Sequence, residues 1–125
     1  MPSQKSQLGT LGENYAESYL VSRNYLILCK NYRCRFGEID IIAVDYSNGE
    51  LCFVEVKTRT SSLFGEPQDA VDYRKKEKIF KTALHFFQTS TQKHPSIWRS
   101  DVIAVKLDAE RRFAGIEHFK NIFNG

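Results

Sequence analysis

Two β-type segments joined through Asn48-Gly49 constrain the fold of this chain more than any other feature. The segments Glu38–Tyr46 and Glu50–Arg59 are rich in Ile, Val and Phe, as strands prefer. Asn-Gly between two such runs is the strongest short-range signal for a β-hairpin, because both residues tolerate a positive φ. The sequence therefore predicts that these two strands are antiparallel neighbours in a sheet.

The predicted hairpin brings charged residues together. If its loop has two residues, Asp40 lies directly opposite Lys57, and Glu38 lies opposite Arg59. Paired residues share a face of the sheet, and so do residues two apart on one strand. Asp40, Glu55 and Lys57 are therefore expected to point the same way.

This group of charges on a largely apolar sheet needs compensation, since unpaired buried charges are strongly destabilising. An ion pair between Asp40 and Lys57 would compensate two of them. A bound divalent cation would also account for Glu55, because Mg²⁺ prefers one or two carboxylates together with water and phosphate oxygens. From the residues alone, both explanations remain open.

The remaining elements follow from periodicity and from strand-forming composition. Asn24 is expected to end the first helix. The predicted elements are a helix over Leu8–Ser22, strands over Tyr25–Tyr32, Glu38–Tyr46 and Glu50–Arg59, a helix from about Gln68 to Thr89, and strands over Trp98–Leu107 and Phe113–Phe119. The order α-β-β-β-α-β-β predicts an α/β fold, with helices packed on one mixed sheet. At 125 residues, we expect a single domain spanning 1–125.

Composition excludes some classes of protein. No apolar run is long enough to cross a bilayer, and the N-terminus lacks the apolar segment of a signal peptide, so we expect a cytoplasmic protein without a membrane partner. Cys29, Cys34 and Cys52 lack the paired spacing of a zinc site and read as free thiols. A net charge of +3 permits nucleic-acid binding without establishing it, and on composition alone a solvated helix face explains the basic run 74–81 better.

The two hairpin strands resemble a known catalytic core. Gly37–Ala43 (GEIDIIA) and Phe53–Arg59 (FVEVKTR) resemble the D…ExK core of the PD-(D/E)xK nuclease superfamily. The proline of its "PD" element is absent, because Ile39 precedes Asp40, but that proline is not chemically required. The superfamily core, α-β-β-β-α-β, agrees with the predicted order and implies a restriction-endonuclease-like fold.

Nearly the whole chain resembles the YraN family of small bacterial proteins, which are regarded as distant relatives of archaeal Holliday-junction resolvases. The resemblance extends beyond the hairpin to both predicted helices and a late strand. The matching positions are Gly12-Glu13, Ala16-Glu17, Gly65, Pro67, Ala70-Val71, Lys75 and Asp101-Val102-Ile103.

The resemblance implies a role for each residue of the core. Asp40 and Glu55 would bind Mg²⁺ or Mn²⁺, the Val56 carbonyl would add a third oxygen, and Lys57 would position the attacking water. Glu13 would be a further acidic ligand, direct or through water. Its alternative is an exposed carboxylate that stabilises the first helix through the helix dipole.

Three further residues are implied more weakly. Arg59 and Lys75 would contact substrate phosphates, with a solvated surface role as the alternative. Related nucleases often place a polar residue near the metal at the position of Gln68, where helix capping is the alternative.

The function implied is metal-dependent endonucleolytic hydrolysis of phosphodiester bonds, on branched or structured DNA by analogy, in repair or recombination. Cutting four-way junctions would favour a twofold homodimer, because such a substrate offers two equivalent strands. The alternatives are a nucleic-acid-binding module without catalysis and an interaction subunit of a DNA-processing assembly. Fold-level analogy does not decide among them.

Overall fold

The computed structural model describes residues 4–60 and 73–122. Its elements are α1 (Gln4–Ser22), β1 (Tyr25–Cys34), β2 (Gly37–Asp45), β3 (Glu50–Arg59), α2 (Tyr73–Thr89), β4 (Trp98–Leu107) and β5 (Phe113–Phe119). The predicted order of helices and strands is confirmed. Gln68 and the expected start of the second helix lie outside the described residues. Within the described ranges, no helix is long and apolar enough to cross a membrane.

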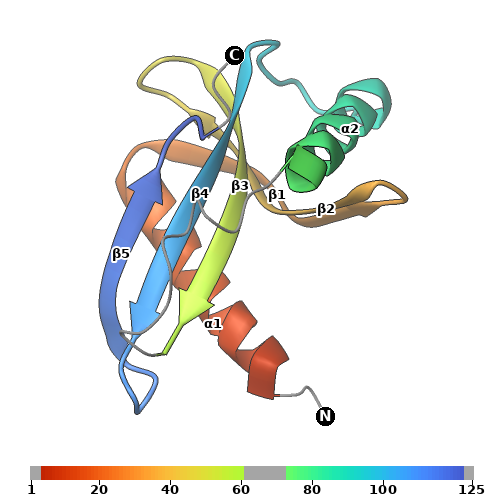
Figure 1. Ribbon diagram of the computed structural model, residues 1–125. Coiled ribbons are helices and arrows are strands. Elements are labelled where there is room, and N and C mark those ends of the chain that lie inside the picture. The colour runs from red at the N-terminus through yellow and green to blue at the C-terminus, as the bar shows by residue number, and fades with distance from the viewer. Residues whose placement is uncertain (1–3, 61–72, 123–125) are drawn as a thin grey trace.

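The five strands form one sheet in the order β1-β2-β3-β4-β5 (Figure 1). Neighbouring strands are antiparallel, except that β3 and β4 are parallel. A parallel pair needs a crossover connection, and α2 lies between these two strands in the sequence. The mixed sheet predicted from the sequence is confirmed.

The helices cover opposite faces of the sheet. Helix α1 packs across β1, β3 and β4, whereas α2 packs over β1 and β2 (Figure 1). Successive residues of β3 divide between two cores, with Cys52 and Val54 on the α1 side and Leu51 and Phe53 on the α2 side. Both faces of β3 are therefore buried, as the apolar composition of the hairpin strands predicted.

Gly12 fixes how closely α1 approaches the sheet, and Asn24 follows the end of this helix. Gly12 approaches β3 so closely that a Cβ atom there would collide with the side chain of Thr58. The helix ends at Ser22, and Asn24 follows in a left-handed conformation with φ of 70°. Asn24 thus ends the helix as predicted, because asparagine tolerates this conformation better than most residues.

The β2–β3 hairpin differs from the predicted register by two residues. Asp45 pairs with Glu50, so the loop spans the four residues 46–49 instead of two. The Asp45 Oδ1 atom accepts hydrogen bonds from the backbone N–H and the hydroxyl of Ser47, at 2.9 and 2.6 Å. An aspartate that hydrogen-bonds two residues ahead starts the turn early, and this local competition lengthens the loop.

Two predicted pairings are therefore wrong. Lys57 does not lie opposite Asp40, because the described β2–β3 ladder ends before it reaches either residue. Glu38 pairs with Arg33 of β1 instead of Arg59, and its carboxylate lies 3.1 Å from Arg33 Nε. A shift of two residues, unlike a shift of one, leaves every side chain on its predicted face.

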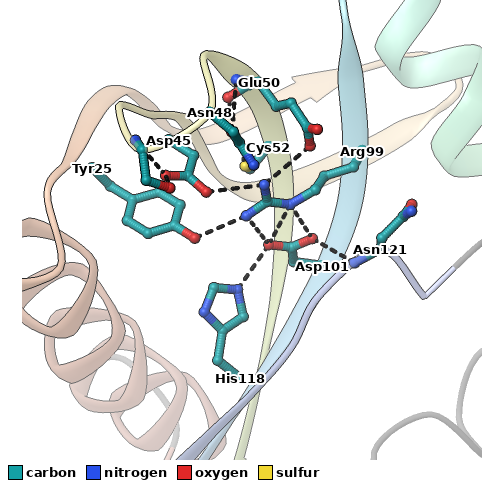
Figure 2. A network of polar contacts seen from close by, with 10 residues as sticks. Tyr25, Asp45, Asn48, Glu50, Cys52, Arg99, Asp101, His118 and Asn121 are labelled. Carbon is teal, nitrogen blue, oxygen red and sulfur yellow. Dashed lines mark hydrogen bonds and ion pairs between the residues drawn. The ribbon is translucent and has the colours of Figure 1, made fainter.

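A buried polar network connects the hairpin turn to β4 (Figure 2). Arg99 is only 6% exposed, and its guanidinium lies 3.0 Å from Asp45, 3.1 Å from Glu50 and 3.0 Å from Asp101. The Tyr25 hydroxyl lies 2.8 Å from Arg99 Nη2. Charge-assisted hydrogen bonds to one planar guanidinium hold the ends of β1, β2, β3 and β4 in fixed relative positions.

The same network reaches β5 and the segment after it. His118 Nε2 lies 2.7 Å from Asp101 Oδ2, and the Asn121 backbone N–H donates to Asp101 Oδ1 at 2.9 Å (Figure 2). Burial alone would raise the pKa of Asp101, but hydrogen bonds from His118, Arg99 and Asn121 outweigh burial and lower it. These contacts account for the burial of the Asp101 carboxylate through its role in holding β4, β5 and the following segment together.

Candidate active site

Asp40 lies where β2 separates from β3 and where its pairing with β1 is interrupted for one residue. The β2–β3 ladder ends at the pair Ile41–Val54, and the β1–β2 ladder has no pair at Asp40, opposite the left-handed Asn31 (φ 55°). Outside these ladders, Asp40 Oδ2 accepts a hydrogen bond of 2.7 Å from the backbone N–H of Val56. The side chain of Asp40 therefore takes over the connection to β3 where backbone pairing ends.

Glu55 and two lysines form a charged cluster on the same side. Glu55 Oε1 lies 3.0 Å from Lys57 Nζ and 2.5 Å from Lys75 Nζ. The exposed fractions of these side chains are 21% for Glu55, 19% for Lys57 and 32% for Lys75. The ion pairs are thus shielded from water on most sides, which makes them stronger than pairs on an open surface.

The other oxygen of Glu55 is left without a partner. Within the described ranges, Glu55 Oε2 is the buried side-chain polar atom that has no hydrogen bond. Leaving a buried acceptor unsatisfied costs roughly 1–3 kcal/mol, and more for a charged group. Both lysines contact Oε1, so neither of these ion pairs involves Oε2.

Asp40 experiences a strongly acidic environment. Burial raises the pKa of its carboxyl, and the carboxylates of Glu13, Glu55 and Glu38 raise it further. The hydrogen bond from Val56 acts in the opposite direction, and the resulting pKa is about 6. Asp40 therefore holds its proton more tightly than an ordinary aspartate, because burial and the neighbouring carboxylates both disfavour its ionised form.

The pKa of Lys57 is shifted in the opposite direction, below its usual value. Burial lowers the pKa of its ammonium, and so does the neighbouring Lys75, whereas Glu55 partly restores it. Desolvation and like-charge repulsion both favour the neutral amine. A lowered pKa brings Lys57 closer to the pH at which it can exchange a proton, which is typical of functional lysines.

Glu13 approaches Asp40 from α1. It is partly buried, and its negative charge is close enough to raise the pKa of Asp40. Burial also raises the pKa of Glu13, while Lys30 and a hydrogen bond from Asn31 lower it. The expectation of a fully exposed helix carboxylate therefore does not describe Glu13.

The donor set fits a cation that keeps part of its hydration shell. Within residues 4–60 and 73–122, no group of three or more His, Cys, Asp and Glu side chains could hold a metal ion. Asp40 and Glu55 nevertheless offer two carboxylates, one of them with an unsatisfied buried oxygen. Mg²⁺ is commonly bound by one or two carboxylates plus water and phosphate oxygens, so the pair suits this ion better than a metal that needs a complete protein cage.

A cavity of about 550 Å³ adjoins the two carboxylates. Asp40 and Glu55 both line it, which shows that they face a common space, and Lys75 and Lys78 line it from α2. Arg33 contributes from β1. The cavity lining therefore combines these cations with the carboxylates of Asp40, Glu55 and Glu38.

Residues 12–105 match the model of the uncharacterised protein family UPF0102. The chain belongs to this family. UPF0102 is the YraN-like family expected from the sequence, and the match includes every residue discussed above for the charged cluster.

Full-length relatives within UPF0102 are similar to the chain throughout. A UPF0102 protein of Caldanaerobacter subterraneus is 43% identical over 95% of this chain and 96% of its own length. Another from Moorella thermoacetica is 40% identical over 98% of this chain and 100% of its own. A third from Clostridium botulinum is 40% identical over 93% of each chain. The names of these relatives state no activity.

In this UPF0102 chain, the structure brings together most of the predicted site. Asp40, Glu55 and Lys75 line one cavity, and Lys57 contacts Glu55 from the same strand. Arg59 is exposed near the end of β3, where its Nη1 donates to the Thr58 carbonyl at 3.0 Å. Gln68 is outside the described residues.

Sequence reasoning missed two features of the UPF0102 site. Lys75 was expected to contact phosphate, but its ion pair with Glu55 was not foreseen, because no local pattern links α2 to β3. The irregularity at Asn31 was also missed. Asparagine is uncommon in strands and tolerates the left-handed conformation, so its presence within β1 was the available signal.

Proposed function

We propose that this protein is a metal-dependent endonuclease that hydrolyses phosphodiester bonds in DNA, with Asp40, Glu55 and Lys57 at its active site. The observation that carries the proposal is the buried, unpaired Oε2 of Glu55 beside Asp40, whose pKa is raised to about 6. A buried carboxylate oxygen without a hydrogen bond, next to a second carboxylate that burial and neighbouring negative charges destabilise, would favour binding of a cation. The similarity to the PD-(D/E)xK core supports the same conclusion.

The carboxylates would hold Mg²⁺ or Mn²⁺. Asp40 and Glu55 would bind it directly, the Val56 carbonyl would add an oxygen, and Glu13 would bind through water from α1. When bound, such an ion lowers the pKa of a coordinated water and neutralises charge on a phosphoryl oxygen. Asp40 must lose its proton to serve as a ligand, so metal binding should favour a pH above about 6.

The lysines would act on the water and the phosphate. Lys57, held by Glu55 at 3.0 Å, would orient the attacking water toward the phosphorus atom. Lys75 lines the cavity, where its ammonium would contact a phosphate oxygen and offset developing negative charge. Arg59 would bind a phosphate further along the strand. Gln68 is proposed only by analogy as a contact near the metal.

The test is cleavage of end-labelled linear, flapped and four-way DNA with Mg²⁺, with Mn²⁺ and with EDTA. Wild type is compared with Glu55→Ala and Lys57→Ala, after circular dichroism has confirmed that all three are folded. We expect metal-dependent cutting by wild type and a rate at least ~100-fold lower in both variants. Equal cutting by all three proteins, or cutting in EDTA, would contradict the proposal.

The two alternative functions give different results in the same experiment. A binding module without catalysis would retain DNA, with an affinity that falls steeply as salt rises, but would cut none of the substrates. An interaction subunit would neither cut nor retain DNA. Wild-type binding, measured by fluorescence anisotropy at two salt concentrations, therefore separates all three functions.

A further inference from the structure

The cavity beside the carboxylates has an interior that phosphate chemistry does not explain. Phe53, Ile39 and Ile79 line it and are 1%, 4% and 7% exposed, so its walls are apolar where they meet the core. A phosphate would gain nothing from these side chains. A flat and mostly apolar group would gain from burial against them.

Two hydroxyl groups interrupt the apolar lining. Ser100 lies on β4 and Thr82 on α2, and both line the cavity while being almost completely buried. The Ser100 hydroxyl lies 3.5 Å from the Phe53 carbonyl, longer than the roughly 2.5–3.0 Å of a good O–H···O hydrogen bond. Ser100 therefore retains hydrogen-bonding capacity for a ligand in the cavity.

Other side chains that line the cavity are charged. The cations Arg33, Lys75 and Lys78 line the cavity together with the carboxylates described above. Arg33 is paired with the exposed Glu38, and Lys75 with Glu55. Apolar walls with a few hydroxyls, next to charged side chains that include three cations, match the chemistry of a nucleotide. Its base would face the apolar walls and its phosphates the cations.

We propose that this cavity holds one unpaired nucleotide of the DNA strand, next to the phosphate that is cut. The inference rests on the proposed function, because it places that phosphate at Asp40 and Glu55. A volume of about 550 Å³ falls within the roughly 300–1,000 Å³ of typical small-molecule sites. A base that is stacked and paired in a duplex can enter such a space only after it is unpaired and unstacked, at a cost of a few kcal/mol, whereas an unpaired base leaves the stack at little cost.

The proposal defines the substrate class. DNA with unpaired nucleotides at the cutting site, such as a single-stranded flap or overhang, should be preferred over a continuous duplex. Four-way junctions should be cut only where strand exchange leaves a nucleotide unpaired. Preference for a flap over an intact four-way junction therefore distinguishes this proposal from recognition of the junction shape.

The experiment compares a flapped DNA and a continuous duplex of the same sequence. Each carries 2-aminopurine beside the cutting site, and its fluorescence reports whether that base enters the cavity. Binding is measured in EDTA and cleavage in Mn²⁺. We expect wild type to cut the flap at least ~10-fold faster than the duplex, and to change 2-aminopurine fluorescence only in the flap.

Variants locate the effect in the cavity. Cys34 is partly buried and lines the cavity. Among the described residues, no hydrogen bond or ion pair joins it to Asp40 or Glu55. The variant Cys34→Trp should fill this space and abolish both the fluorescence change and the preference for the flap. Ala109→Trp adds the same bulk to an exposed turn between β4 and β5 and should preserve both.

The failure of this inference is distinguishable from failure of the proposed function. Equal cutting of flap and duplex, or a folded Cys34→Trp that keeps the preference, would overturn the nucleotide cavity but leave metal-dependent cleavage intact. A fluorescence change without cleavage of either DNA would support the cavity and contradict the nuclease. The wild-type comparison of two substrates decides the question even if Cys34→Trp does not fold.

Discussion

The carboxylate of Asp40 accepts a hydrogen bond of 2.7 Å from the backbone N–H of Val56, beyond the last regular pair of the β2–β3 ladder. This contact replaces a backbone hydrogen bond with a side-chain one. It fixes the Asp40 side chain against the strand that carries Glu55 and Lys57. The interruption of the sheet is therefore what brings residues of two separating strands to one site.

Asp40 should reduce the stability of the metal-free protein at neutral pH. Its pKa is raised from 3.8 to about 6, so the folded state keeps a proton that the unfolded chain has already lost. The free energy of unfolding should fall as pH rises through this interval and then level off. At ~1.4 kcal/mol per pKa unit, Asp40→Asn should be more stable than wild type by about 2–3 kcal/mol at pH 8.

Urea denaturation in EDTA at pH 4 and pH 8 measures this effect. At pH 4 the two proteins should have nearly equal stability, because protonated aspartate and asparagine are similar in shape and both can accept the hydrogen bond from Val56. A variant that is less stable than wild type at pH 8 would show that the acidic environment of Asp40 is already compensated by the chain itself.

The contribution of Asp45 to the free energy of unfolding should depend on pH in the opposite way. Burial alone would raise its pKa, but hydrogen bonds from Ser47 and Arg99 outweigh burial and lower it to about 2. Its contribution to stability is therefore complete above pH 4 and is lost as pH falls through about 2. Asp45→Asn should lower the free energy of unfolding by about 2 kcal/mol at pH 7.

Denaturation curves between pH 2 and pH 7 test the prediction for Asp45. The difference between Asp45→Asn and wild type should narrow steadily below pH 4. A constant difference over this range would mean that Arg99 gains little from the charge of Asp45, and that the turn is held by hydrogen-bond geometry alone.

Loss of Lys75 should slow DNA cleavage more than loss of its neighbour Lys76. Only Lys75 both lines the cavity and contacts Glu55, although removal of either changes the net charge equally. Lys75→Ala should reduce the cleavage rate roughly 10- to 100-fold, as loss of an outer partner at a metal site typically does. Lys76→Ala should have little effect on that rate.

The dependence of DNA binding on salt provides a second measurement for the lysines. If Lys75 contacts a phosphate, Lys75→Ala should reduce the slope of log affinity against log salt by about one. An unchanged slope together with a reduced rate would assign Lys75 to the positioning of Glu55 alone. Equal losses in Lys75→Ala and Lys76→Ala would contradict the placement of Lys75 in the site.

Gly12 should be intolerant of a side chain. A Cβ atom at this position would collide with Thr58, so Gly12→Ala must push α1 away from β3 and should cost about 1–3 kcal/mol of stability. Gly9 lies on the same helix with open space around its Cα, so Gly9→Ala should stabilise by up to about 1 kcal/mol. Thermal melts of both variants test this pair. Equal melting temperatures would show that α1 does not approach β3 as closely as described.

The sequence predicted the elements of this fold because their signals are local. Strand composition gave both bounds of Glu50–Arg59, and Asn24 marked the end of α1. The hairpin turn was located correctly, but its register was not, because Asp45 starts the turn with its own side chain. Asn48-Gly49 favours a tight loop, and a stronger local hydrogen-bond pattern overrode that preference.

The candidate site was predictable only in part. The shared face of Asp40 and Glu55 follows from strand periodicity and survives a register shift of two. The contact between Lys75 and Glu55 depends on where α2 packs over the sheet, and no sequence period carries that information. The unpaired Glu55 Oε2 likewise follows from the contact of both lysines with the other oxygen, Oε1.

Mn²⁺ binding tests the role of the two carboxylates directly. Electron paramagnetic resonance of free Mn²⁺ should show one ion bound per wild-type chain at pH 8, and binding should weaken as Asp40 takes up its proton below about pH 6. Asp40→Asn and Glu55→Gln keep the shape of the site but remove a charge, and each should lose most of the affinity. Wild type that binds no Mn²⁺ at pH 8, or binds it as tightly as the two variants do, would contradict a metal centre at Asp40 and Glu55.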